Sequence, residues 1–401
     1  MHIHVQHLLG GGHLVRMKAL AAALVRAGHQ VVVLSGGLGR ERLADGASTR
    51  HADGYRLVQL PAIQTAPGDF TTLLDRDGAP VTDAFKRCRS EQLLHRIRAD
   101  APQVVLVETF PFGRRALRFE LLPLMRLLGE IKPRPLVLCS LRDILQRRAP
   151  KRDAHAADAV DAWFDHVLVH ADPAVATLRD TFPLAARLHG RVFHSGYVHS
   201  RPQAPRVRDD AHELNGVVVS AGAGAVGFEL LQTALQAKAH SALHDRVWRL
   251  LVGEHAPQAQ FDALRRQAGD GVVVERNRAD FIALLARCAV SVSQAGYNTV
   301  LDVVAAGCRA VLAPFAQHGE TEQTHRAELF ARLGRAVALA ERDLAPRTLA
   351  AAIDRAARLD LSACRPIDLN GAAATVEFIE RHASPSTSTS TATNTAANIS
   401  R

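Results

Sequence analysis

The chain has 401 residues, of which 47% are hydrophobic, and its 49 Lys and Arg residues against 40 Asp and Glu residues give a net charge of +9. This composition excludes wholesale disorder, and the length predicts about two domains. No run of about 18 uncharged apolar residues occurs, so no membrane span is predicted, and the N-terminus lacks the pattern of a secretion signal. Five scattered cysteines outside CxxC spacing favour a reducing compartment over a disulfide or zinc framework.

Two rounds of α/β alternation follow along the chain. The first has a strand at 2–8, a glycine turn at 10–12, a helix over 14–25, and apolar strands at 31–34, 104–107, 136–139 and 167–169. Residues 64–80 are expected to be irregular. The second has strands at 217–220, 249–252, 272–275, 290–293 and 310–313, another glycine turn at 221–227, and helices at 228–238, 280–287 and 298–306. Apolar strands alternating with helices predict parallel, doubly wound sheets.

The expected fold class is therefore α/β, with two Rossmann-like domains that face an interdomain cleft. The predicted boundaries are an N-terminal domain at 1–200, a linker at 201–213, a second domain at 214–365, a C-terminal helix at 366–383 that could return to the first domain, and a disordered low-complexity tail at 384–401. Ligands of such sheets bind beyond the carboxyl ends of the strands.

The first half carries the excess charge, with 27 basic and 19 acidic residues in 1–200 against 22 and 21 in 201–401. This excess suits an anionic substrate or an anionic membrane surface, and the alternative is arginine-rich codon bias. No base-reading motif accompanies it, so a nucleic-acid partner is not expected.

The first glycine turn places His13 at the start of a helix, behind Gly11 and Gly12. A histidine there is either a general base or a capping and packing residue. Glu108 ends an apolar strand, where it either reaches the cleft or serves as a paired structural carboxylate. Phe112, Arg114 and Arg115 follow, and they suit either a phosphate or flat ring of an acceptor or one amphipathic helix. Alternate histidines near the N-terminus make a poor chelating set, so no metal is expected.

The second half offers groups suited to a nucleotide. The turn containing Ser220, Gly222 and Gly224 can hold a pyrophosphate through backbone N–H groups, unless it is a simple tight turn. A later segment begins a helix with Gly296, Asn298 and Thr299, and places Asp302 one turn beyond Asn298, where a carboxylate can bind a ribose diol. A polar loop at the same sheet edge could bind sugar hydroxyls through Gln317, Glu322 and Gln323.

Residues 293–326 resemble the donor-binding signature of GT-B glycosyltransferases, in particular the family of the undecaprenyl-diphospho-muramoylpentapeptide N-acetylglucosaminyltransferase, which is glycosyltransferase family 28-like. The matching positions are Gly296, Thr299, Asp302, the Ala-Ala-Gly turn at 305–307, Pro314, Phe315, Glu322 and Gln323. The first glycine turn is similar to the family's Gly-Gly-His acceptor loop. Residues 40–200 are closest to an uncharacterised predicted-glycosyltransferase branch.

The resemblance implies an inverting glycosyltransferase that moves a hexose-type sugar from a nucleotide diphosphate sugar, expected to be a UDP-sugar, to a hydroxyl acceptor. It implies Asp302 on the ribose, Glu322 and Gln323 on the sugar, residues 276–278 including Asn277 beside the base, His13 as the base, and Glu108 as base or orienting residue. No cofactor or metal is expected. The expected location is the cytoplasm, with contact to the inner membrane if the acceptor is anionic or lipid-linked.

Two positions depart from the family pattern. The ribose ligand is Asp302 where Glu is usual, and Glu322 stands where the first glutamine is usual. A carboxylate cannot donate to an acyl oxygen, so this site does not favour an N-acetylated sugar. A GT-B-fold UDP-sugar 2-epimerase and a non-catalytic nucleotide-sugar-binding protein are the alternatives.

Overall fold

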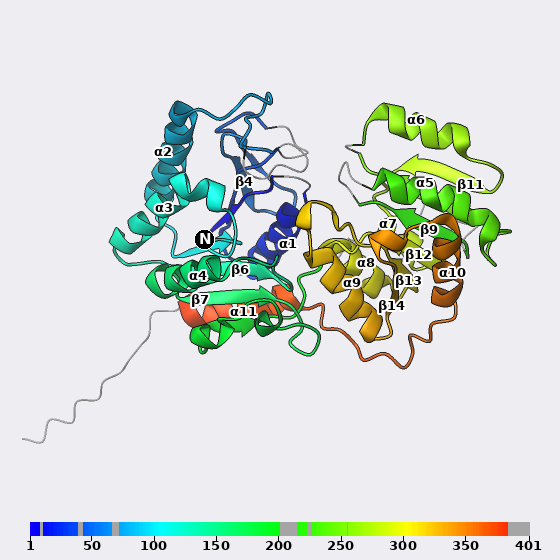
Figure 1. The fold of residues 1–401 in the computed structure, drawn as a ribbon. Coiled ribbons are helices and arrows are strands. Elements are labelled where there is room, and N and C mark those ends of the chain that lie inside the picture. Colours follow the sequence, from blue (N-terminus) through cyan, green and yellow to red (C-terminus); the bar gives the residue numbers. More distant parts are fainter. Residues whose placement is uncertain are drawn as a thin grey trace, which may run out of the picture.

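The structure is a computed structural model that describes residues 1–8, 11–38, 43–65, 72–200, 215–222, 227–254 and 256–383. The predicted linker and the low-complexity tail lie outside these residues. Within them the chain folds into two α/β bodies (Figure 1).

The first body is built on an eight-stranded sheet in the order β3-β4-β2-β1-β5-β6-β7-β8. Only the β3–β4 pair is antiparallel. The strands are β1 (His2–Val5), β2 (Val32–Ser35), β3 (Ser48–Arg50), β4 (Arg56–Gln59), β5 (Val104–Glu108), β6 (Leu136–Arg142), β7 (His166–His170) and β8 (Val192–His194). The helices of this body are α1 (Gly12–Arg26), α2 (Asp83–Asp100), α3 (Arg118–Glu130), α4 (Pro150–Trp163) and α11 (Gly371–Ala383).

The second body has a six-stranded parallel sheet in the order β11-β10-β9-β12-β13-β14. Its strands are β9 (Val217–Ser220), β10 (Trp248–Val252), β11 (Val272–Arg276), β12 (Val290–Ser293), β13 (Ala310–Leu312) and β14 (Ala336–Ala338). Its helices are α5 (Phe228–Ala237), α6 (Gln258–Gln267), α7 (Phe281–Leu285), α8 (Tyr297–Ala306), α9 (Glu322–Arg332) and α10 (Pro346–Ala356).

Apolar strands and helix faces form the cores of both bodies. β1 and β5 are buried along their whole length, as parallel strands covered on both faces are. Helix α1 adds a stripe of Leu14, Met17, Leu20 and Leu24 at helical spacing. The predicted irregular region holds only the isolated bridges Gln64↔Leu74 and Leu74↔Pro80 among its described residues.

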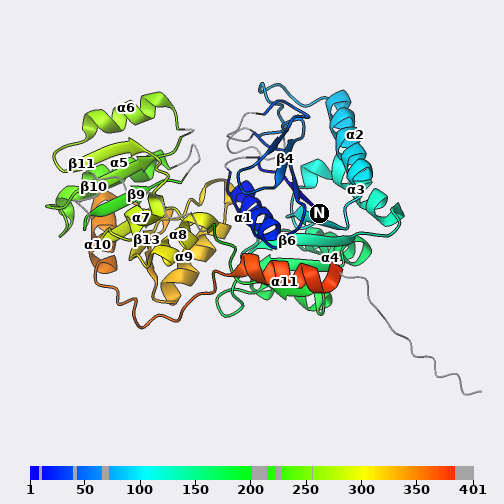
Figure 2. The same cartoon turned by 180° about the vertical axis from the view of Figure 1, so that it is seen from behind.

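Helix α11 is the last element of the described residues, and it lies on the first body beside α1 (Figure 2). The Phe378 ring stacks on Phe193 of β8 at a centroid distance of 4.5 Å. The chain returns beside the point where it leaves, because Val198 forms a bridge with Asn370 and the Gly371 N–H donates to the Tyr197 carbonyl at 3.0 Å. The second body is thus inserted between β8 and α11.

No helix in the described part of the chain is long and apolar enough to cross a membrane.

Candidate active site between two helix N-termini

The N-termini of α1 and α8 meet between the two bodies. The Asn298 side-chain amide on α8 donates to the Gly12 carbonyl at the start of α1, at 3.1 Å. A Cβ on Gly12 would lie 3.1 Å from that amide nitrogen, so the close approach favours glycine. Gly11 is the N-cap residue of α1, and Gly296 that of α8. Two helix N-termini in one place make a site that favours an anion.

Glu108 is the centre of a charged cluster on the first-body side of this junction. The carboxylate is 1% exposed at the end of β5. Its Oε1 lies 2.6 Å from His13 Nδ1 and accepts hydrogen bonds from Arg16 Nη2 and from Thr109 Oγ1, each at 2.6 Å. Arg114 Nη2 lies 3.4 Å from Oε2. One buried carboxylate therefore orients a histidine while two guanidinium groups neutralise it.

The protonation states of this pair follow from burial and charge. Burial lowers the pKa of His13 to about 3, although the Glu108 charge acts to raise it, so the imidazole is neutral at pH 7. Burial alone would raise the pKa of Glu108, but His13, Arg114 and Arg16 hold it well below its usual value. An ionised carboxylate only accepts, so the His13 proton is on Nδ1. Nε2 is then the free acceptor of the ring, as a general base requires.

The other predicted acceptor residues lie apart from one another. Phe112 is 4% exposed, and its ring packs edge-on against Phe182 at 5.0 Å, so it belongs to the core of the first body. Arg114 has a left-handed backbone conformation with φ of 61° and turns toward Glu108, whereas Arg115 is exposed. Thus Gly11, Gly12 and Arg114 lie with His13 and Glu108, whereas Phe112 is buried in the core.

A second buried ion cluster joins the two bodies. Arg326 of α9 forms two hydrogen bonds to the Asp143 carboxylate after β6, at 2.9 and 2.6 Å, and one to Glu322 Oε1 at 2.7 Å. Glu322 Oε2 lies 2.7 Å from Arg142 Nη2 at the end of β6. Burial acts against the charge of Arg326 and of Asp143, but their attraction raises the pKa of Arg326 and lowers that of Asp143, so both stay charged. Glu322, expected on the sugar, is here bound to two arginines.

Tyr297 closes the interface from the first turn of α8. Its hydroxyl donates to the His170 carbonyl at 3.0 Å and accepts from the Val198 N–H at 3.1 Å. The guanidinium groups of Arg16 and Arg326 lie 5.3 and 5.9 Å from its ring centroid. One aromatic ring thus lies near an arginine of the Glu108 cluster and near an arginine of the Arg326 cluster.

The first residues of the loop after β9 turn sharply. Gly222 has a φ of 76°, and its N–H lies 3.3 Å from Ser220 Oγ. The Asn277 side-chain amide, from the residue after β11, donates to the Gly222 carbonyl at 3.2 Å. Ser220, Gly222 and Asn277 are therefore together at the carboxyl end of the second sheet, while Gly224 lies outside the described residues.

The remaining predicted donor residues lie on α8 and before and within α9. Asp302 Oδ1 is 2.9 Å from His199 Nε2, and burial raises the pKa of Asp302 although His199 acts against this. Thr299 is half-buried on the first turn of α8. Gln317 donates to Glu341 at 3.1 Å, and the Gln323 side-chain carbonyl accepts from the Phe315 N–H at 3.3 Å.

The N-terminal histidines have structural partners. His2 Nε2 lies 3.0 Å from Asp100, and His4 Nε2 lies 3.6 Å from Glu120. Within the residues that the structure describes, no three or more His, Cys, Asp or Glu side chains form a group that could hold a metal ion.

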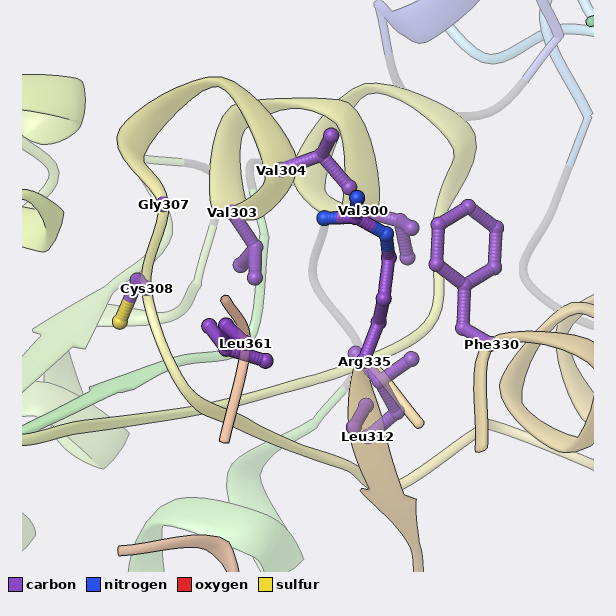
Figure 3. A pocket seen from close by; sticks show the side chains of 10 residues that line it. Val300, Val303, Val304, Gly307, Cys308, Leu312, Phe330, Arg335 and Leu361 are labelled. Atoms are coloured by element: carbon purple, nitrogen blue, oxygen red, sulfur yellow. The ribbon is translucent and has the colours of Figure 1, made fainter. Parts of the chain in front are cut away.

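A cavity of about 10 Å³ lies between α8, β13 and α9 (Figure 3). Its lining is mostly apolar and includes Val300, Val303, Phe330 and Arg335. This volume corresponds to roughly one water molecule. The cavity is too small for a nucleotide or a sugar, so the junction of α1 and α8 remains the candidate site.

Local sequence patterns missed four residues of this site. Arg16 follows His13 by three residues, a helical spacing that could have placed both on one face of α1. Asp143, Arg326 and His199 have partners more than a hundred residues away, and no local signal connects them.

Residues 217–377 match the Glycosyltransferase family 28 C-terminal domain. Over 355 residues, covering 86% of each chain, the protein is 26% identical to the UDP-N-acetylglucosamine--N-acetylmuramyl-(pentapeptide) pyrophosphoryl-undecaprenol N-acetylglucosamine transferase of Phenylobacterium zucineum. Similar solved structures include the calicheamicin glycosyltransferase CalG4, with a TM-score of 0.62 and 16% identity over 95% of this chain and 97% of that one. The structure of Acinetobacter baumannii MurG has a TM-score of 0.57 and 19% identity, over 95% of this chain and 99% of that one.

These similarities confirm the expected α/β class with two Rossmann-like domains. They favour a transferase over the epimerase and the non-catalytic binding protein, because the matched family and the Phenylobacterium relative are both glycosyl transferases by name. Residues 217–377 are similar to the C-terminal domain of that family, and the protein is a glycosyltransferase with the GT-B fold.

Proposed function

We propose that this enzyme moves a hexose-type sugar from a UDP-sugar to a hydroxyl acceptor with inversion at the anomeric carbon. The observation that carries the proposal is the His13–Glu108 pair, held at the N-terminus of α1 and facing the N-terminus of α8. The Phenylobacterium relative is named for a UDP-sugar, which supports UDP as the nucleotide.

The chemistry assigns one role to each member of the pair. His13 Nε2 takes the proton of the acceptor hydroxyl while the acceptor oxygen attacks the anomeric carbon of the donor. The bond from that carbon to the diphosphate oxygen breaks, and its electron pair leaves with the nucleoside diphosphate. Glu108 holds the imidazole through Nδ1 and stabilises the imidazolium that forms.

The second body binds the donor in this proposal. The Ser220–Gly222 turn and the start of α8, with Gly296, Asn298 and Thr299, contact the diphosphate. Asp302 binds the ribose and so exchanges His199 for the ribose diol, and Asn277 lies beside the base. Gln317, Gln323 and Glu322 are assigned to the sugar. The helix N-termini of α1 and α8 favour an anion at this junction, which supports departure of the diphosphate without a metal ion.

The acceptor is proposed to be anionic or lipid-linked, and to be bound by the first body at a cytoplasmic membrane surface. Exposed arginines near the starts of α3 and α4 support this. They are Arg115, Arg118 and Arg152. The name of the Phenylobacterium relative also includes a pyrophosphoryl-undecaprenol group. Anionic liposomes should pull the protein down at low salt and release it as salt rises, whereas binding that salt does not weaken would contradict an electrostatic contact.

Calorimetry with UDP, dTDP and GDP tests the donor site, and turnover of a UDP-sugar tests the base. We expect UDP to bind most tightly, and His13→Ala to abolish transfer while retaining UDP affinity. Glu108→Gln should lower kcat with little change in UDP affinity, and EDTA should have no effect. Transfer that survives in His13→Ala, or no nucleotide binding at millimolar concentration, would reject the proposal.

A further inference from the structure

The ion cluster that joins the two bodies contains two arginines, Arg142 and Arg326. Of these two, only Arg142 is partly exposed. We propose that Arg142 binds the donor diphosphate and stabilises the charge of the leaving group, with Glu322 as its counter-ion in the absence of donor. This inference rests on the proposed function, and it names a residue on the acceptor-side body that acts on the donor.

The position of Arg142 supports this role. It is the last residue of β6, a carboxyl end of the first sheet, and its side chain crosses to Glu322 at the start of α9 with a 2.7 Å contact. The side chain is 29% exposed, whereas that of Arg326 on the other side of Glu322 is 1% exposed. Arg142 is therefore the member of the cluster that an incoming anion can reach.

Arg142 also lies within electrostatic reach of the proposed base. Burial is the largest cause of the lowered pKa of His13, and the charges of Arg114 and Arg142 lower it further. The pKa of Arg114 is lowered in the same way by burial and by Arg142. Arg142 thus acts electrostatically on the proposed base as well as on Glu322.

The other arginines near the site are bound to buried carboxylates and are less able to move to a ligand. Arg16 and Arg114 neutralise the buried Glu108, and Arg326 is bound to Asp143 through two hydrogen bonds. Glu322 keeps its 2.7 Å hydrogen bond from Arg326 when Arg142 turns away. When a diphosphate replaces Glu322 on Arg142, Glu322 therefore still has Arg326 as a partner, and Arg142 exchanges a carboxylate for a phosphate.

The exchange acts on the chemical step as well as on binding. When the bond from the anomeric carbon to the β-phosphate oxygen breaks, that oxygen gains the electron pair, and the negative charge beside Arg142 increases. A guanidinium fork contacts two phosphate oxygens at once and binds the charged product-like state more strongly than the intact donor. Arg142 should therefore contribute to kcat in addition to affinity.

The inference is tested by calorimetry of Arg142→Met with uridine, UMP and UDP. Arg126→Met, on the exposed face of α3, is the charge-matched control. Arg142→Met should weaken UDP binding about 10-fold or more, the effect of one charge-assisted hydrogen bond, and leave uridine binding unchanged. Arg142→Lys should recover part of the loss. Glu322→Gln should tighten UDP binding, because it removes the competing carboxylate.

The outcomes separate this inference from the proposed function. If wild-type protein does not bind UDP, the proposed function fails. If wild-type protein binds UDP but Arg142→Met binds it equally well, Arg142 does not contact the diphosphate. Equal losses for uridine and UDP would assign Arg142 a purely structural role and overturn the inference. Weaker UDP binding in Glu322→Gln would overturn the exchange of counter-ions.

Discussion

Replacement of Arg326 by Met should uncouple the two bodies. Arg326 belongs to α9 of the second body, yet its strongest partner is Asp143 of the first body, and it also donates to the Ala295 carbonyl at 2.8 Å. Met fills a similar volume and removes every one of these donors. Asp143 is then left with the Ile144 N–H and the Tyr197 hydroxyl at 3.5 Å.

The size of the effect follows from burial. Asp143 is 1% exposed, so its charge has no access to water once its partner is lost. Removal of one member of a buried ion pair costs about 3–5 kcal/mol, a large part of a typical unfolding free energy of roughly 5–15 kcal/mol. At about 2–4 °C per kcal/mol, Tm should fall by roughly 6–20 °C. The double variant Arg326→Met with Asp143→Asn should recover part of the lost stability, because it no longer contains an unpaired buried charge.

The two tryptophans report the bodies separately. Trp163 ends α4 in the first body, and Trp248 begins β10 in the second, so Trp163→Phe and Trp248→Phe backgrounds give one probe each. In urea, Arg326→Met should separate the two fluorescence transitions, whereas Arg332→Met, exposed on the same helix, should not. Transitions that stay coincident with unchanged midpoints would refute the view that this ion cluster couples the bodies.

Three further outcomes follow from the described contacts. His13 has a pKa of about 3 in the folded chain against 6.5 unfolded, so its contribution to stability is complete above pH 6.5 and is lost as pH falls toward 3. In urea titrations, His13→Gln should flatten the dependence of the unfolding free energy on pH by about 1.4 kcal/mol per pH unit in that window, and an unchanged slope would contradict it. Glu120→Gln should leave the buried Arg89 underpaired and destabilise the transition reported by the first-body tryptophan by about 3–5 kcal/mol, with a smaller change at the second. Tyr297→Phe should cost about 1–3 kcal/mol in Tm-derived stability because the buried Val198 N–H loses its acceptor, and a neutral result would show that another acceptor replaces the hydroxyl.

Patterns local in sequence predicted the elements that carry most of the proposed site. The apolar runs at 104–107 and 290–293 correspond to β5 and β12, and the helix expected over 14–25 corresponds to α1, because a buried parallel strand and an amphipathic helix are encoded within a few residues. The short strands β3, β4, β8 and β14 went unpredicted. β3 has little buried surface, and β8 is only half-buried, so neither leaves an apolar run.

Pairings between distant segments could not be predicted in this way. Phe112 was expected on the acceptor and lies in the core, because an aromatic residue beside arginines looks the same in sequence whichever way it points. The five cysteines look scattered, yet Cys288 and Cys308 bring their sulfur atoms to 3.2 Å. They precede the neighbouring strands β12 and β13, so only the sheet order brings them together.

The chain leaves the first body at Val198 and returns beside it at Asn370. The second body is therefore an insertion whose two ends lie close together, so it can be exchanged as a unit. Both ends of the inserted segment leave the first body at one place, and α11 closes the first body behind them. A different donor-binding unit could replace residues 200–367 and keep β1 to β8 and α11, provided that its ends have the same spacing and that it supplies a cation in place of Arg326 for Asp143. Recombination could therefore change the sugar that such an enzyme transfers while the acceptor surface is inherited intact.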